Sequence, residues 1–182
     1  MKKENIIQFV GFVTTLDFRD FIPQWEEYAR QFMKMPGAKI LQRETEAKNS
    51  FKYISQHEFR EEGFRFSFMK GRNSEHFPEQ RVKVTQAGGY IPLQTEAPQH
   101  HVKGYVKIMA FVGHNENDIE FYRRLPNFRY LNIYQAYYEN CAYGYIMEFF
   151  SKEADAPLLI DQLRSRTGSE AALYKDCKVP QI

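Results

Sequence analysis

Two stretches of the chain, residues 36–64 and 126–154, carry one pattern twice. The second begins 90 positions after the first (126 against 36), in a chain of 182 residues. Identical residues recur in register and without a gap: Pro36, Leu41, Tyr53, Glu58 and Phe59 match Pro126, Leu131, Tyr143, Glu148 and Phe149. Such a repeat indicates that one structural unit occurs twice, which constrains the fold more than any single motif does.

The order of predicted strands and helices repeats as well. Runs of β-branched and aromatic residues predict strands, and apolar residues at helical spacing predict helices. The first half gives a strand at 6–16, a helix from Asp20 onward, strands at 38–46 and 51–59, a helix at 60–72 and a strand at 81–93. The second half gives a strand at 102–113, a helix at 117–125, strands at 128–138 and 141–150, a helix at 155–166 and a strand at 170–178. Each half therefore reads β-α-β-β-α-β, which is the ferredoxin-like unit.

Local signals predict where these elements begin and bend. Asp20, Asn117 and Asp155 are the candidate N-caps of three helices, because short polar side chains satisfy free N–H groups there. Pro36-Gly37 is expected to end the first helix. The helix at 60–72 rests on the repeat, since the local pattern fits a strand equally well. Gly88-Gly89 indicates a bulge or bend in its strand, and the leucines of the last helix are expected to face inward: Leu158, Leu159 and Leu163.

Composition limits the classes of partner. The chain has 25 basic and 23 acidic residues, a net charge of +2, which does not favour nucleic acid or an anionic membrane. No apolar run is long enough to span a bilayer. Two cysteines, Cys141 and Cys177, make no disulfide framework, and we expect them to be unpaired. The sequence thus predicts a soluble, cytoplasmic α+β protein with repeats at 1–94 and 102–182, joined by a linker at 95–101.

A short motif in the second repeat resembles a known family. Residues 148–154, Glu-Phe-Phe-Ser-Lys-Glu-Ala, resemble the junction between strand 3 and helix 2 in antibiotic-biosynthesis-monooxygenase-like proteins of the dimeric α/β barrel superfamily. Pro36-Gly37 resembles the element that precedes strand 2 in that family. The resemblance implies two antiparallel sheets packed face to face. It also implies a small-molecule protein, monooxygenase-like if it is an enzyme, acting on an aromatic or hydrophobic substrate.

His57 is the most informative titratable residue. It is predicted to share one face of its strand with Tyr53 and to precede Glu58 directly. A neutral imidazole among aromatic rings can act as a base or as a polar anchor. Trp25, on the apolar face of the first helix, and Tyr53 are expected to line the site, and Glu58 to orient its neighbours. A hydrogen-bonded core histidine is the alternative interpretation, because one histidine defines no geometry.

Two further residues complete the candidate site. His114 follows a central strand and could lie at the mouth of a pocket, or cap a loop, and Tyr143 is the repeat partner of Tyr53. His76 stands in a polar loop at 73–80, and His100-His101 in the linker has no partner at metal-ligand spacing, so no metal site is predicted. No cofactor is predicted either; the resemblance leaves haem open, but no residue pattern supports it.

Other classes of function remain as alternatives. A small-ligand binder without catalysis, or a structural oligomer such as a homodimer, would show the same fold signals. A tandem RNA-recognition module is a further alternative, because residues 142–146, Ala-Tyr-Gly-Tyr-Ile, resemble an aromatic strand of that family. Cys141 replaces the basic residue expected before this run, and the near-neutral charge also disfavours RNA.

Overall fold

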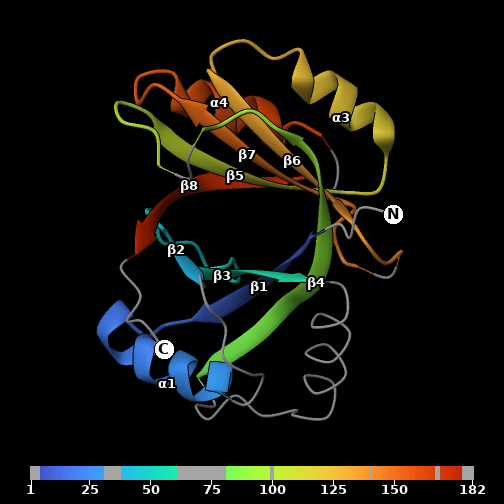
Figure 1. The fold of residues 1–182 in the computed structure, drawn as a ribbon. Coiled ribbons are helices and arrows are strands. Elements are labelled where there is room, and N and C mark those ends of the chain that lie inside the picture. Colours follow the sequence, from blue (N-terminus) through green and yellow to red (C-terminus); the bar gives the residue numbers. More distant parts are fainter. Residues whose placement is uncertain are drawn as a thin grey trace.

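Eight strands close into a single antiparallel barrel, with three helices outside it in the part of the chain described (Figure 1). The computed structural model describes residues 5–30, 38–60, 81–98, 101–139, 141–166 and 169–177. The strands are β1 Asn5–Thr14, β2 Lys39–Arg43, β3 Tyr53–Arg60, β4 Val82–Thr95, β5 Val106–Val112, β6 Tyr130–Ala136, β7 Tyr145–Ser151 and β8 Glu170–Cys177. The helices are α1 Phe18–Arg30, α3 Glu116–Arg123 and α4 Ala156–Arg164.

The barrel consists of two sheets that join along two edges. Residues 5–95 contribute strands in the order β4-β1-β3-β2, and residues 106–177 contribute β8-β5-β7-β6. Pairing of β2 with β8 and of β4 with β6 closes the ring. In Figure 1, α1 lies under the lower sheet and α3 and α4 lie over the upper one. The chain is therefore α+β, as expected, and it closes its barrel without a second copy.

The alternation of side chains along each strand fills both faces of each sheet. Aromatic and aliphatic side chains from both halves meet inside the barrel, among them Phe9, Tyr90, Phe111 and Tyr134. Phe9 packs edge-on against both Tyr90 and Tyr134, with ring centroids 5.6 and 5.3 Å away. The outer face of one sheet packs against α1, and the outer face of the other packs against α3 and α4. Each sheet thus buries its apolar side chains on both sides, as a layered fold requires.

Two of the three predicted helix caps lie earlier in the sequence than expected. The carboxylate of Asp17, not Asp20, accepts the N–H of Asp20 at 2.9 Å, and α1 begins at Phe18. Asn115, not Asn117, caps α3 by accepting the N–H of Asn117 at 3.1 Å. The reason is geometric, because a cap residue must precede the first turn to reach the N–H two or three positions on. Asp155 does stand at the N-cap of α4, but within the described residues its side chain makes no capping hydrogen bond.

The predicted bulge at Gly88-Gly89 is wrong. Both glycines pair regularly, with Phe9 and Gln8 of β1. The register of β4 shifts instead beside Gly11 and again between Pro92 and Gln94. These shifts let one long strand pair with both sheets, because a bulge adds twist and bends the strand.

The remaining expectations concern the leucines of α4, the two cysteines and several segments outside the described part of the chain. In α4, Leu159 and Leu163 are fully buried, but Leu158 is 56% exposed, because it lies on the solvent side of the helix. Cys141 and Cys177 are free thiols. The helix predicted at 60–72, apart from Arg60 at the end of β3, lies outside the described residues, as do Pro36-Gly37, His76 and His100. Among the described helices, none is long and apolar enough to cross a membrane.

Candidate functional site

A stacked Trp–His pair lies between α1 and the outer face of β3. The period of two along β3 places Tyr53, Ser55 and His57 on this face. Trp25 approaches from α1 and is completely buried. The two rings of Trp25 and His57 are nearly parallel, at 4°, with centroids 5.9 Å apart. His57, Tyr53 and Trp25, which the sequence predicted to share a site, therefore all lie between α1 and the outer face of β3.

The environment keeps the His57 imidazole neutral. Only 4% of His57 is exposed. Burial lowers its pKa from 6.5 to about 4, because the low-dielectric surroundings disfavour the imidazolium. At neutral pH the ring is thus an uncharged donor and acceptor.

Three buried polar atoms around this pair have no hydrogen-bond partner among the described residues. They are Nδ1 of His57, Nε1 of Trp25 and the hydroxyl oxygen of Ser55. A buried polar group without a partner costs about 1–3 kcal/mol. Such groups are rare in native proteins and call for an explanation such as a ligand or a catalytic role. The α1–β3 face therefore holds three buried polar atoms without a hydrogen bond to the described residues, in an aromatic surround.

Tyr53 serves as a wall of this site. Its ring stacks on Phe21 with centroids 4.1 Å apart at 14°. Its hydroxyl donates to the carbonyl of Leu16 at 3.1 Å, and burial raises its pKa. The phenol is already paired, so Tyr53 supplies surface and rigidity rather than a free polar group.

Glu58 does not join His57. Consecutive residues of a strand point to opposite faces, so Glu58 lies on the other side of β3, where it is exposed. Its carboxylate accepts a hydrogen bond from the side chain of Asn5. The predicted role of Glu58, to orient its neighbours, therefore does not extend to His57.

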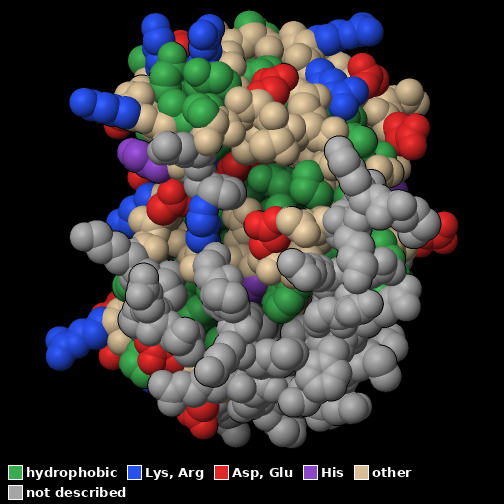
Figure 2. Space-filling model, in the orientation of Figure 1, with side chains coloured by type: hydrophobic (Ala, Val, Ile, Leu, Met, Phe, Trp, Pro, Cys, Tyr) green, Lys and Arg blue, Asp and Glu red, His purple; other side chains and the backbone are tan. Residues whose placement is uncertain are grey.

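A charged network that sequence reasoning missed lies at one end of the barrel interior. Lys107 contacts Glu148 at 3.3 Å and Asp176 at 2.8 Å. Asn132 donates to Glu148 at 2.7 Å, and its own oxygen accepts the backbone N–H of Glu96 at 2.9 Å. Lys107 and Glu148 are both buried. Figure 2 shows basic and acidic side chains together in the band between the two sheets.

Lys39 on β2, a lysine near this network, also has a lowered pKa. Burial lowers this pKa, the charge of Lys107 acts in the same direction, and the carboxylates of Asp176 and Glu148 oppose the shift. The signal available in the sequence was Lys107 itself, a charged residue in an otherwise apolar strand.

Tyr143 lies at a third place, away from Trp25 and His57. Its ring packs 5.4 Å from that of Phe111, and its carbonyl accepts the hydroxyl of Tyr90 at 3.0 Å. Tyr145, the other aromatic residue of the RNA-like run, is buried against the helices of the second half. Base stacking needs aromatic rings on an open sheet face. The closed barrel offers none at Tyr143 and Tyr145, so these two residues do not form the stacking surface that an RNA-recognition module needs.

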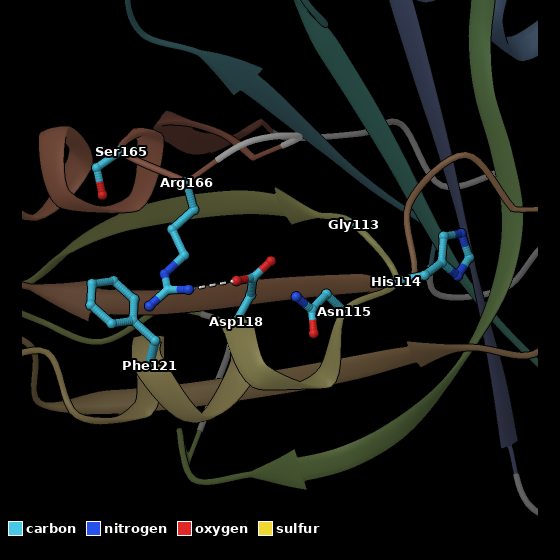
Figure 3. A pocket seen from close by; sticks show the side chains of 7 residues that line it. All are labelled: Gly113, His114, Asn115, Asp118, Phe121, Ser165 and Arg166. Carbon is cyan, nitrogen blue, oxygen red and sulfur yellow. Dashed lines mark hydrogen bonds and ion pairs between the residues drawn. The ribbon is translucent and has the colours of Figure 1, made fainter.

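His114 lines a cavity of ≈ 700 Å³ in the second half (Figure 3). The cavity lies between the start of α3 and the turn after α4, lined also by Gly113, Asn115, Asp118, Phe121, Ser165 and Arg166. Arg166 reaches toward Phe121 and Asp118, whereas the His114 ring points away from that ion pair. Nε2 of His114 lies 2.8 Å from the carbonyl of Cys141. The cavity is therefore not at the Trp25–His57 pair, although His114 stands where a pocket-mouth residue was expected.

Close packing fixes His114 against the turn that precedes β7. A Cβ added to Gly144 would lie 2.6 Å from the His114 Cα, whereas a Cβ on Gly113 would meet no described atom within 4 Å. We therefore expect Gly144→Ala to destabilise the protein by about 1–3 kcal/mol, because backbone must move. Gly113→Ala should stay within about 0.5 kcal/mol. Urea unfolding of both variants measures the difference, and equal stabilities would contradict the packing.

Neither His57 nor His114 fits an axial ligand of haem iron. The imidazole of His57 is buried, with the Trp25 ring over its face. His114 uses Nε2 in its contact with Cys141, and its Nδ1 would be only 2.9 Å from a Cβ on Gly144. Iron ligation would place a large flat macrocycle in front of the coordinating nitrogen, and the 4% exposure of His57 leaves no room for a ring of that size. Haem is therefore not supported by these two residues.

Comparisons with known proteins place the fold. Neither a protein-family model nor a curated protein sequence matches the chain. Among solved structures, an anthrone oxidase-like protein matches with a TM-score of 0.55 and 10% identity, covering 97% of this chain and 92% of that one. A chlorite dismutase mutant from Candidatus Nitrospira defluvii matches with 0.57 and 7%, covering 96% and 92%. A Fusobacterium nucleatum protein, whose name assigns it provisionally to the monooxygenases, matches with 0.51 and 13%, covering 98% and 94%.

These three neighbours share the fold of this chain. They cover nearly the whole chain, so the likeness extends over both sheets. The resemblance drawn from residues 148–154 is thereby confirmed at the level of the fold. At identities this low the likeness shows the fold alone.

Proposed function

We propose that the chain binds a small aromatic or hydrophobic molecule at the α1–β3 face. The observation that carries this proposal is the set of three buried polar atoms, on His57, Trp25 and Ser55, that find no partner in the described part of the chain. An aromatic ligand with a hydroxyl or amide would complete these hydrogen bonds while its ring packs among the aromatic side chains. His57 is the polar anchor, and Trp25 and Tyr53 are the walls.

Monooxygenase-like catalysis is the finer form of this proposal. It is supported by neighbours named as an anthrone oxidase-like protein and as a monooxygenase. The pKa of His57, about 4, limits its strength as a base. Taking a proton from a phenol of pKa about 10 would be uphill by roughly 8 kcal/mol. A binding role is therefore favoured, and catalysis requires a substrate with a more acidic proton.

The tandem ferredoxin-like architecture belongs to the same proposal. The equal strand order in residues 5–95 and 106–177, and the two matching joints of the barrel, support a duplicated unit with the linker at 95–101. Because the barrel closes within one chain, a homodimer would use another surface. A cytoplasmic location is also proposed, on the near-neutral composition.

Ligand binding can be read directly, because Trp25 is the only tryptophan of the chain. Titration with small phenols such as 4-methylphenol and 2-naphthol should change Trp25 emission, with calorimetry giving the affinity. His57→Ala should weaken binding about tenfold, the value of one buried hydrogen bond. His114→Ala, in the separate cavity, should not. Equal affinity of the wild type and His57→Ala would remove His57 from the site.

A further inference from the structure

The cavity beside α3 is a second place where a ligand can bind, separate from the α1–β3 face. It is a pocket open to solvent, with a volume of ≈ 700 Å³, so a ligand there would keep part of its surface exposed. We propose that it binds a small organic carboxylate, held by the guanidinium of Arg166. Residues assigned to the α1–β3 site take no part in it, so the two proposals stand independently.

Arg166 is held in position before any ligand arrives. Its guanidinium lies 3.8 Å from the centroid of the Phe121 ring, a cation–π contact. Its Nη1 donates to Asp118 at 3.0 Å, and the Asp118 side chain is only 10% exposed. A guanidinium fixed on two sides loses little freedom when it binds a third group.

One edge of this guanidinium remains available. Among the described residues, the bond from Nη1 to Asp118 is the only hydrogen bond of the Arg166 side chain, of which 37% is exposed. The remaining N–H donors match the two oxygens of a carboxylate in a planar fork. Figure 3 shows Arg166 among the lining side chains, with Phe121 and Asp118 beside its guanidinium.

Neighbouring groups support the same ligand. The oxygen of Asn115 is engaged as the cap of α3, which leaves its NH₂ group to donate. Gly113 faces open space as far as the described residues extend, so the cavity has room beside it for an organic body. Asp118 offsets part of the positive charge, and we therefore expect weak affinity, with a Kd of roughly 1 mM.

The probe for this site is 4-fluorobenzoate, followed by ¹⁹F NMR, with 4-fluorobenzamide as its neutral counterpart. Benzoate should bind at least tenfold more tightly than benzamide, and Arg166→Gln should weaken benzoate at least tenfold. Because Arg166→Gln also releases Asp118, a second variant keeps that ion pair. Gly113→Leu fills the open space, and its backbone is not in the positive-φ region. It should abolish binding while leaving the melting temperature unchanged.

His57→Ala is the control that separates the two sites, and it should bind benzoate like the wild type. Equal binding of benzoate and benzamide would overturn the carboxylate assignment. Unchanged benzoate binding by both Arg166→Gln and Gly113→Leu would overturn the site itself. Loss of benzoate binding in His57→Ala alone would assign the ligand to the α1–β3 face and refute the cavity proposal.

Discussion

Lowering the pH from 7 to 4 should cost the folded protein about 3 kcal/mol through His57 alone. Burial lowers the pKa of this imidazole from 6.5 to about 4 in the folded state. Between these two values the unfolded chain binds a proton that the folded chain does not. Stability is therefore complete above pH 6.5 and falls as the pH drops through that value, and the loss levels off below about pH 4.

The measurement is urea unfolding from pH 7.5 to 4, followed by Trp25 emission, for the wild type and His57→Phe. Phenylalanine keeps a ring against Trp25 but removes the titrating group. The carboxylates titrate in both proteins, so the His57 contribution is the difference between the two pH profiles. Parallel profiles would show that His57 is not buried as a neutral group, and would weaken its assignment as the anchor of the α1–β3 site.

The succession of most strands and helices along the chain was accessible from sequence, because it depends on local periodicity. The apolar face of α1, with Trp25 inward, follows from spacing alone and is present in the structure. The caps at Asp17 and Asn115 were missed by two or three residues. Several short polar residues near each helix start can serve as the N-cap. Which of them does so depends on the residue at which tertiary packing starts the first turn.

The grouping of site residues was harder to predict. His57 and Glu58 are adjacent in sequence, yet the strand period sends them to opposite faces. The cavity joins the start of α3 to Arg166, and nothing in the sequence relates these segments. The start of α3 and Arg166 come together only in the folded barrel. Long-range strand pairing sets that arrangement, and local propensity does not encode it.

The Lys107–Glu148–Asp176 network is the clearest product of that register. Its members come from β5, β7 and β8, which pair through Met109 with Glu148 and through Lys107 with Tyr174. A single lysine or glutamate in a buried strand would be an unpaired charge with a large desolvation cost. Together they form ion pairs at the end of the barrel interior, and Asn132 connects Glu148 to the backbone of Glu96.

Lys107→Met should therefore destabilise the protein by about 3–5 kcal/mol. The substitution leaves Glu148, which has no exposed surface, without its counter-ion. Lys52→Met is a matched control, because Lys52 pairs at 3.6 Å with Glu46, whose side chain is 91% exposed. That change should cost less than about 1 kcal/mol, as expected for surface ion pairs.

A double substitution distinguishes the lost ion pair from lost packing. Lys107→Met combined with Glu148→Gln removes both charges, while the amide oxygen introduced by the second change can still accept from Asn132. The double variant should recover most of the stability lost in Lys107→Met, giving a coupling of about 2 kcal/mol or more in a cycle of urea unfolding experiments. Additive losses would mean that Lys107 contributes through its methylene chain and its contact with Asp176. In that case the buried pair would not be what joins β5 to β7 at this end of the barrel.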